Sequence, residues 1–333
     1  MDPRLRRTLE RWECTQPRPL GEDSGSRRSF RVDHPSLGTA LVLLYPAQRS
    51  GEDEDAYFEF RALHAYLDPV MRVPTIIQAC DEDRALLVED LGETTLEKRL
   101  VSHPEEEAQW ADQAGWLLGT WLGPLTLGAP GHAFFMGRSL DLPRMEFEWA
   151  HSRAHFFEAF LQKEPPRWLD RLMEEVHASL QGRARFLAHR EFHVRNLMVQ
   201  QDRLVMVDFQ DARCAAATYD LASILFDGYW DWSKEAGQRL VERVRRELGW
   251  SDGDLWEELS LSALQRNLRA LGSFGRQLTE CRNSQVAPAI PRTLRHLRGH
   301  FLRLRHGEGV LAAEHWLRLA EKRLWKHGGA APE

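Results

Sequence analysis

The sequence has few cysteines and no long apolar run, and each absence excludes a class of protein. Its four cysteines, Cys14, Cys80, Cys214 and Cys281, lie far apart and form no CxxC pair, which excludes a zinc knuckle and a disulfide framework. We expect four isolated buried thiols. No apolar stretch reaches the roughly 18 residues needed to cross a bilayer, and residues 1–30 are too polar for a signal peptide. We therefore predict a cytoplasmic protein without a membrane partner.

An excess of basic charge is also missing. The formal net charge is -6, which argues against a general affinity for nucleic acid, and the arginine-rich stretch 292–305 is interpreted as a charged surface. With 333 residues, of which 43% are hydrophobic and 28% charged, the chain can bury a core as one large domain or two lobes. We expect a small-molecule partner, and the oligomeric state stays open.

The pattern of apolar residues divides the chain near residue 90. Before it, residues 29–32 and 39–45 have the alternation typical of strands, and residues 55–67 have helical spacing. A second strand pair, 74–79 and 84–89, flanks an acidic turn. These features predict a small, β-rich N-terminal lobe.

From residue 96 onward the pattern is that of amphipathic helices, with one exception. Two short apolar strands, 197–199 and 204–207, surround a polar turn and predict a hairpin inside the helical segment. The expected fold class is therefore α+β, with a large, mostly helical C-terminal lobe. The expected helices include residues 105–121, 145–161, 168–180 and 234–248.

Polar residues at the two ends of this hairpin are the candidate catalytic and metal-binding residues of the sequence. The segment from His189 to Asn196 precedes the hairpin, and Asp208 follows it. The amide oxygen of Asn196 and the carboxylate of Asp208 are hard ligands of the kind that Mg²⁺ prefers. Glu191 lies five residues before Asn196, where a base that orients an acceptor hydroxyl belongs. This combination predicts phosphoryl transfer.

These residues resemble the aminoglycoside phosphotransferase and choline kinase-like family, and within it the N-acetylmuramate and N-acetylglucosamine anomeric kinases of peptidoglycan recycling. The loop is similar to the family's HxDxxxxN pattern. The segments Gly25–Val32, Asp208–Ala212 with Tyr219–Leu221, and Gln265–Gly275 carry the likeness. The resemblance implies a protein-kinase-like fold with an N-terminal nucleotide-binding lobe at residues 1–91, a catalytic and substrate lobe at 92–327 and a frayed tail at 328–333.

The resemblance also implies a nucleotide site and a reaction. Gly25, Ser26 and Arg28, with Arg27 as the alternative arginine, would contact the phosphates of ATP. Glu59 matches the helix glutamate of the family, and the backbone of Glu89 and Leu91 would hold adenine. Asn196 and Asp208 would bind Mg²⁺. The implied reaction is transfer of the γ-phosphoryl group to a sugar hydroxyl, the anomeric one of an N-acetylated amino sugar, with Glu191 as the catalytic residue.

Two departures from the family pattern bear on the chemistry. Residues 41–45 contain no lysine where the family places one against the phosphates, and neither a GxGxxG nor a GxxxxGK[ST] motif is present. Glu191 stands where the family has aspartate, and its extra methylene would move the carboxylate by about 1.5 Å. These departures keep open a pseudokinase that binds nucleotide without turnover. A kinase of an amino alcohol or an aminoglycoside also stays open, because fold alone does not fix the substrate.

The remaining polar residues of the helical lobe have both a structural and a functional interpretation. His189 is expected to support the loop rather than to act as a base. Asp220 is expected to anchor the loop through backbone amides. Asp211, Asp227 and Arg266 are candidate substrate contacts, against a turn cap for Asp211 and a solvated helix face for Arg266.

Overall fold

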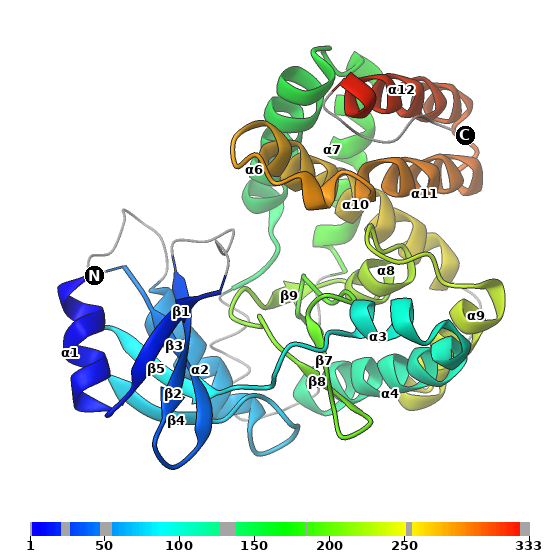
Figure 1. Ribbon diagram of the computed structural model, residues 1–333. Helices are drawn as coiled ribbons and strands as arrows, with labels where there is room; N and C mark the ends of the chain where they lie inside the picture. Colours follow the sequence, from blue (N-terminus) through cyan, green and yellow to red (C-terminus); the bar gives the residue numbers. More distant parts are fainter. Residues whose placement is uncertain are drawn as a thin grey trace. The chain divides into compact units, whose positions relative to one another are not determined.

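The computed structural model describes residues 2–20, 27–46, 55–126, 138–183, 186–250 and 255–326. The chain divides into two compact units (Figure 1). The first unit is Met1–Thr94 with Leu197–Gln210, and the second is Thr95–Asn196 with Asp211–Glu333.

The first unit contains a five-stranded antiparallel sheet. Its strand order is β1-β2-β3-β5-β4, and β2 pairs with β3 around a turn at residues 35–37, where the sequence predicts one. The edge strand β1 was not predicted because its sequence, TQPRP, has two prolines and no apolar alternation. The strands are β1 (Thr15–Pro19), β2 (Arg28–His34), β3 (Gly38–Leu44), β4 (Ile76–Cys80) and β5 (Ala85–Glu89).

Strands β3 and β5 at the centre of this sheet have buried residues on both faces. Alternate residues of β3 and β5, including Val42 and Leu87, belong to a cluster with Leu5 and Leu9 of helix α1 (Pro3–Arg11). Helix α1 begins at proline and is capped by Asp2, which accepts a hydrogen bond from the Arg4 amide at 2.8 Å. The intervening residues, Leu43, Leu86 and Val88, are also buried and face the opposite side. The predicted helix at 55–67 is α2 (Ala56–Leu67).

The predicted hairpin consists of β7 (Leu197–Gln200) and β8 (Arg203–Met206), with Leu197 opposite Met206. It lies in the first unit, whereas the predicted division at residues 91/92 keeps it with the helical segment. The physical reason is hydrogen bonding to the end of the N-terminal segment: the Val199 amide donates to the Thr94 carbonyl at 2.8 Å, and Gln200 Nε2 donates to the Leu91 carbonyl at 2.6 Å.

The second unit is mostly helical and also contains a small antiparallel sheet of two strands, β6 and β9. The predicted helix at 145–161 is α-helical only to Ser152 and is π-helical from Arg153 to Leu161. The elements are α3 (Leu96–Ser102), η1 (Pro104–Glu106), α4 (Glu107–Thr126), α6 (Leu142–Ser152), η2 (Arg153–Leu161), α7 (Arg167–Gln181), β6 (Phe186–Ala188), β9 (Arg213–Ala215), α8 (Tyr219–Leu225), α9 (Lys234–Leu248), α10 (Leu255–Thr279), η3 (Ser284–Val286), α11 (Ala289–Arg303) and α12 (Gly307–Lys326).

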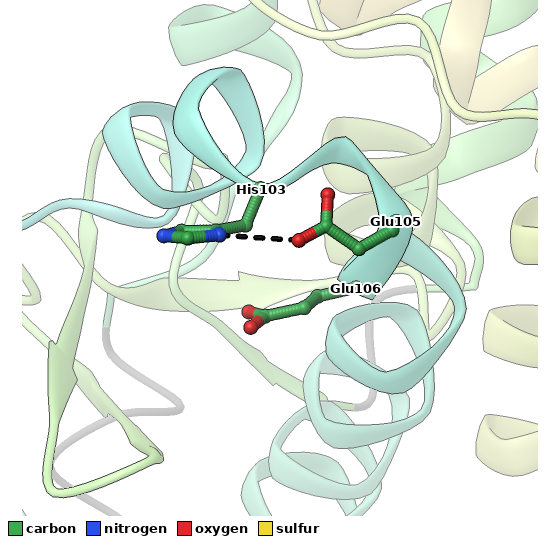
Figure 2. A group of neighbouring side chains, drawn as sticks. All are labelled: His103, Glu105 and Glu106. Atoms are coloured by element: carbon green, nitrogen blue, oxygen red, sulfur yellow. Dashed lines mark hydrogen bonds and ion pairs between the residues drawn. The ribbon is translucent and has the colours of Figure 1, made fainter.

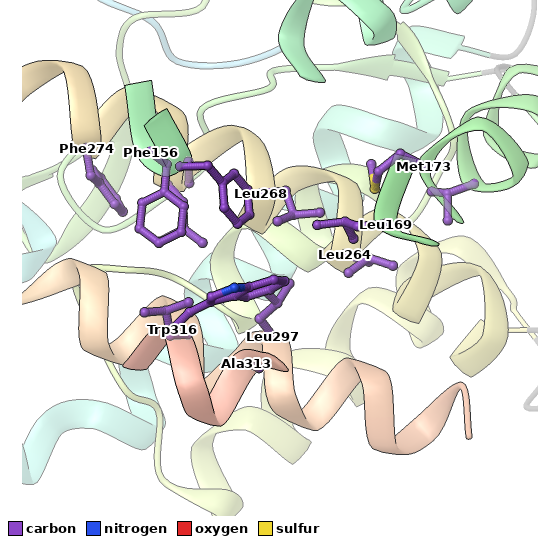
Figure 3. Close-up of a cluster of buried hydrophobic side chains, with 14 of the residues drawn as sticks. Phe156, Leu169, Met173, Leu264, Leu268, Phe274, Leu297, Ala313 and Trp316 are labelled. Carbon is purple, nitrogen blue, oxygen red and sulfur yellow. The ribbon is translucent and has the colours of Figure 1, made fainter. Parts of the chain in front are cut away.

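Helix α10 is the central helix of the second unit. Its residues Leu264, Leu268 and Phe274 belong to a large apolar cluster that includes Phe156 of η2 and Trp316 of α12 (Figure 3). The helix is buried on its polar side as well, because the side chains at positions 265, 266 and 267 are at most 2% exposed. The solvated helix face considered for Arg266 is therefore wrong.

Two further expectations can be compared with the structure. Cys14, Cys80 and Cys214 are buried, as expected, and form no disulfide, whereas Cys281 is exposed, contrary to the expectation. Within the described ranges, no helix is both long and apolar enough to cross a membrane.

Candidate active site

The segment from His189 to Asn196 is a loop that follows β6 and is fixed at its start by Asp220. The Asp220 carboxylate is fully buried in α8 and accepts hydrogen bonds from the His189 amide at 2.6 Å and the Arg190 amide at 2.9 Å. These bonds hold Arg190 in a left-handed backbone conformation, with φ of 73°. Burial raises the pKa of Asp220 to about 7. The predicted anchoring role of Asp220 is confirmed.

A second buried carboxylate, Asp227, holds the other half of the loop. It lies just after α8 and accepts hydrogen bonds from the Val194 amide at 3.0 Å and the Tyr229 amide at 2.8 Å. Asp227 is fully buried, and each of its oxygens accepts one backbone hydrogen bond. The structure therefore gives this residue an anchoring role that the sequence did not indicate, and its contact with substrate stays a prediction.

Glu191 is the acidic member of the loop, and its carboxylate is partly exposed. Its side chain is 25% exposed, and Oε1 accepts a hydrogen bond from Arg269 Nη2 of α10 at 2.5 Å. Oε2 lies 3.5 Å from His193 Nε2. Burial acts to raise the pKa of Glu191, but the charge of Arg269 and the contact with His193 outweigh it and hold the pKa well below its ordinary value. The carboxylate is therefore an anion that accepts hydrogen bonds.

His189 and Asn196 fix the loop internally. His189 is fully buried, and its Nδ1 accepts a hydrogen bond from the Glu191 amide at 3.2 Å, as expected of a supporting residue. Asn196 Nδ2 donates to the Glu191 carbonyl at 3.1 Å. This bond fixes the amide group so that its nitrogen faces the loop and its oxygen points away from that carbonyl. The oxygen is the atom that a metal ion would use.

Asp208 lies in the first unit, two residues after β8. Its backbone is left-handed, with φ of 65°, and its side chain is 37% exposed. Oδ1 accepts hydrogen bonds from Gln210 Nε2 at 2.8 Å and Arg27 Nη2 at 3.3 Å. The neighbouring Phe209 is fully buried and stacks on Phe60 of α2, with ring centroids 4.9 Å apart. Packing of Phe209 therefore fixes the position of the exposed carboxylate.

The two candidate phosphate-binding arginines differ in their contacts. Arg28, which the sequence favours, has a half-exposed side chain that forms an ion pair with Asp2 at the start of α1. Arg27, the alternative, is the arginine that contacts Asp208. Gly25 and Ser26 lie outside the described residues.

The remaining nucleotide candidates of the first unit lie on α2 and at the end of β5. Glu59 is half-buried in the first turn of α2. The Glu89 carboxylate accepts a hydrogen bond from the Thr75 amide at 3.1 Å and pairs with Arg72. The carbonyl of Leu91 accepts the bond from Gln200 described above.

The candidate substrate residues Arg266 and Asp211, both in the second unit, differ in their exposure. Arg266 is 2% exposed, and its Nε donates to Ser223 Oγ at 2.9 Å. Asp211 is exposed, and its carbonyl accepts a hydrogen bond from Arg190 Nη1 at 3.4 Å. The predicted contacts of these residues with substrate stay predictions.

The sequence did not indicate the charged residues that connect to Glu191 through ion pairs. Glu148 of α6 is 5% exposed and pairs with the guanidinium groups of Arg190 and Arg269. Burial acts to raise the pKa of Glu148, but Arg190 and Arg269 outweigh it and lower the pKa below its ordinary value. Glu148 lies more than forty positions before the loop, so no local spacing connects them.

One cluster has the composition of a metal site. Within the described part of the chain, ligand atoms of His103, Glu105 and Glu106 lie within 4.8 Å of one another, and Figure 2 shows the His103 ring facing Glu105. The Glu106 oxygens, however, already accept hydrogen bonds from the Arg99 guanidinium at 2.7 Å and from Trp110 Nε1 at 2.8 Å. These contacts explain the cluster as an ion-pair network that joins α3 to α4.

Residues 18–261, well over half of the chain, match a protein family described as "Phosphotransferase enzyme family". The chain belongs to this phosphotransferase family. It is a small-molecule kinase, since similar curated proteins are named N-acetylmuramate/N-acetylglucosamine kinase. The one from Neisseria meningitidis serogroup B is 28% identical over 295 residues, which cover 83% of each chain. The one from Pseudomonas putida is 26% identical over 274 residues, covering 76% of this kinase and 74% of the relative.

Solved structures of the same fold confirm the α+β, protein-kinase-like architecture of this kinase. Choline kinase LicA from Streptococcus pneumoniae superposes with a TM-score of 0.58 at 12% identity, covering 92% of this chain and 97% of its own. Aminoglycoside phosphotransferase APH(2'')-Ib, solved with ADP bound, has a TM-score of 0.58 at 12% identity, covering 88% and 97%. At this identity the likeness establishes the fold alone.

Proposed function

We propose that this kinase transfers the γ-phosphoryl group of ATP to the anomeric hydroxyl of an N-acetylated amino sugar. The observation that carries the proposal is the Glu191 carboxylate, anionic and partly exposed on a loop that two buried aspartates hold. The names of the relatives support an amino sugar as acceptor, and the ADP bound to the neighbouring phosphotransferase supports a nucleotide as donor. The proposed place of action is the cytoplasm, where ATP is made.

The low pKa of Glu191 fits this acceptor. A carboxylate of low pKa is a weak base, so it accepts a proton more readily from an acidic hydroxyl than from an ordinary one. An anomeric hydroxyl is more acidic than an ordinary alcohol because the ring oxygen withdraws electrons from the same carbon. It therefore needs less help from a base. In the proposed step its oxygen bonds to the γ-phosphorus, the bond from phosphorus to the β–γ bridging oxygen breaks, and the hydroxyl proton passes to Glu191.

The donor side of the reaction needs oxygen ligands for Mg²⁺ and cations for the phosphates. Asn196 and Asp208 offer an amide oxygen and a carboxylate, the donor types that fit Mg²⁺. Bound there, Mg²⁺ would neutralise phosphate charge. Arg27 would contact the phosphates together with Gly25, Ser26 and Arg28, in place of the missing lysine.

The remaining donor contacts follow the family pattern. The backbone at Glu89 and Leu91 would hold adenine, and Glu59 would lie near the phosphate-binding residues. In the second unit Asp211, Asp227 and Arg266 stay candidate contacts of the sugar.

A transfer assay tests the function. The kinase is incubated with γ-labelled ATP, Mg²⁺ and one acceptor from a panel of N-acetylmuramate, N-acetylglucosamine, choline and an aminoglycoside. We expect label on the N-acetylated sugars and loss of their reducing end, since phosphate on the anomeric oxygen blocks ring opening. Label on a sugar that keeps its reducing end would refute the anomeric assignment.

Two variants connect the activity to the site. Glu191→Gln should lower kcat by about 100-fold or more, because it removes the negative charge that accepts the proton. Asp208→Asn should raise the Mg²⁺ concentration needed for half-maximal rate. Binding of ATP without transfer to any acceptor would favour the pseudokinase, and transfer to choline or the aminoglycoside alone would favour the other alternative.

A further inference from the structure

Arg190 and Glu191 are neighbours in sequence with opposite charges, and each forms an ion pair with another helix. Arg190 pairs with Glu148 Oε1 of α6, and Glu191 Oε1 pairs with Arg269 Nη2 of α10 at 2.5 Å. Arg269 Nε also lies 3.4 Å from Glu148 Oε1. The four side chains thus form a ring of alternating charge, which the peptide bond between Arg190 and Glu191 closes. We call these four residues the charge ring.

Exposure increases along the charge ring toward Glu191. The side chains of Arg190 and Glu148 are 1% and 6% exposed, Arg269 is 16% exposed and Glu191 is 25% exposed. The second oxygen of Glu148 accepts a hydrogen bond from Gln265 Nε2 at 2.9 Å, so neighbours hold both of its oxygens. The buried part of the ring is therefore fixed by several contacts, and its partly exposed end is the carboxylate to which we assign the chemistry.

This arrangement explains how the loop can use Glu191, a glutamate at the position where the family has aspartate. Glutamate has one more rotatable bond than aspartate, so its carboxylate loses more freedom when it is fixed and is more easily misplaced. Arg269 binds one carboxylate oxygen. The other, Oε2, lies 3.5 Å from His193 Nε2, which is too long for a strong hydrogen bond. Oε2 is thus the oxygen suited to accept a hydrogen bond from a substrate hydroxyl.

We propose that Arg269 is the positioning residue for Glu191, and that the charge ring fits this site to glutamate rather than aspartate. Glu148 orients Arg269 through the ion pair between them, and the ion pair between Arg190 and Glu148 connects Glu148 to the loop. The proposal rests on the proposed function, because it presupposes that Glu191 orients the acceptor. It adds that Arg269 contributes to the rate only through Glu191.

A double-mutant cycle tests this dependence. Arg269→Met should lower kcat by about 100-fold, as expected for a misplaced catalytic group, with the KM for the sugar nearly unchanged. In the Glu191→Gln background the same change should have almost no further effect, because the carboxylate it positions is gone. Additive losses, or a raised KM with unchanged kcat, would overturn the proposal. Arg276→Met is the matched control, since Arg276 lies on the same helix, is 41% exposed and pairs only weakly with Glu280 at 3.6 Å.

The second test is Glu191→Asp. If glutamate were a poor fit for a site shaped for aspartate, this change would raise kcat. The charge ring predicts the opposite, because the shorter side chain withdraws from Arg269, and a rise in kcat would overturn the proposal.

Folding and function failures can be told apart. Circular dichroism and thermal unfolding show whether Arg269→Met folds, and if it does not, the cycle is run with Arg269→Lys, which keeps the charge but cannot bridge two carboxylates as a guanidinium does. Full activity of Glu191→Gln would refute the proposed role of Glu191 itself. An inactive Glu191→Gln with a fully active Arg269→Met refutes the positioning role alone.

Discussion

Replacement of Asp220 by asparagine removes the ionisable group that anchors the catalytic loop but keeps the size of the side chain. The Asp220 carboxyl group is fully buried and accepts hydrogen bonds from the amides of His189 and Arg190 at 2.6 and 2.9 Å. Asparagine has the same size but one acceptor oxygen, so one buried amide loses its partner. This loss costs about 1–3 kcal/mol at every pH. Asparagine also does not titrate, which isolates the part of the stability that depends on protonation of Asp220.

The free energy of unfolding that depends on protonation of Asp220 follows from its pKa. Burial raises the pKa of Asp220 from 3.8 to about 7, so the folded protein holds this proton more tightly than the unfolded chain does. The stabilisation is complete below about pH 4 and is lost as the pH rises through 7. A shift of about 3 pKa units corresponds to about 4 kcal/mol. Between pH 5 and pH 8 the free energy of unfolding of the wild type should fall by about 3 kcal/mol relative to Asp220→Asn.

The measurement is equilibrium urea unfolding of both proteins at several pH values from 5 to 8 and constant ionic strength, followed by tryptophan fluorescence. The difference between the two proteins cancels the titration of all other groups that the mutation leaves unchanged. A difference that is constant across this range would refute the raised pKa. A difference that changes in the opposite direction would show that the hydrogen bonds from the loop favour the carboxylate more than burial disfavours it.

Two further predictions concern the core of the second unit, each with a matched control measured by urea unfolding. Gly272→Ala should destabilise by about 1–3 kcal/mol, because an added Cβ would lie 2.7 Å from the backbone of Ser152, whereas Gly307→Ala meets no atom within 4 Å and should change stability by less than about 0.5 kcal/mol. Trp316→Ala should cost about 3–5 kcal/mol because the ring is buried, and Trp325→Ala, 62% exposed, should be nearly neutral. Equal losses within either pair would contradict the packing described.

Much of the fold was predictable because it depends on local patterns. The alternation of apolar residues located β2, β3, β4 and β5, and helical spacing located α2 and α9. Strand β1 was missed because its residues, TQPRP, lack that alternation, and its pairing with β2 comes from the rest of the sheet. The π-helical segment from Arg153 to Leu161 was also missed, since apolar spacing does not distinguish it from the α-helix that precedes it.

The loop residues of the candidate site were predictable because their order along the chain carries the chemistry. Glu191, Asn196 and Asp208 stand at fixed distances around a hairpin, and Asp220 follows at the start of a helix. The partners of Glu191 were not predictable in this way. Arg269 lies 78 positions away on α10, and a polar run on a helix has the same pattern whether the helix is buried or solvated.

The sequence by itself determined that this chain has a small sheet-containing part and a large helical part, with a phosphotransferase loop before a hairpin. Local spacing is sufficient for this because strands, helices and turns are each specified by near neighbours. Only the tertiary structure decided that Glu191 is braced by Arg269 and Glu148, and that buried Asp220 and Asp227 hold the loop. Buried charges need partners, and in a folded chain those partners come from distant positions that packing brings together.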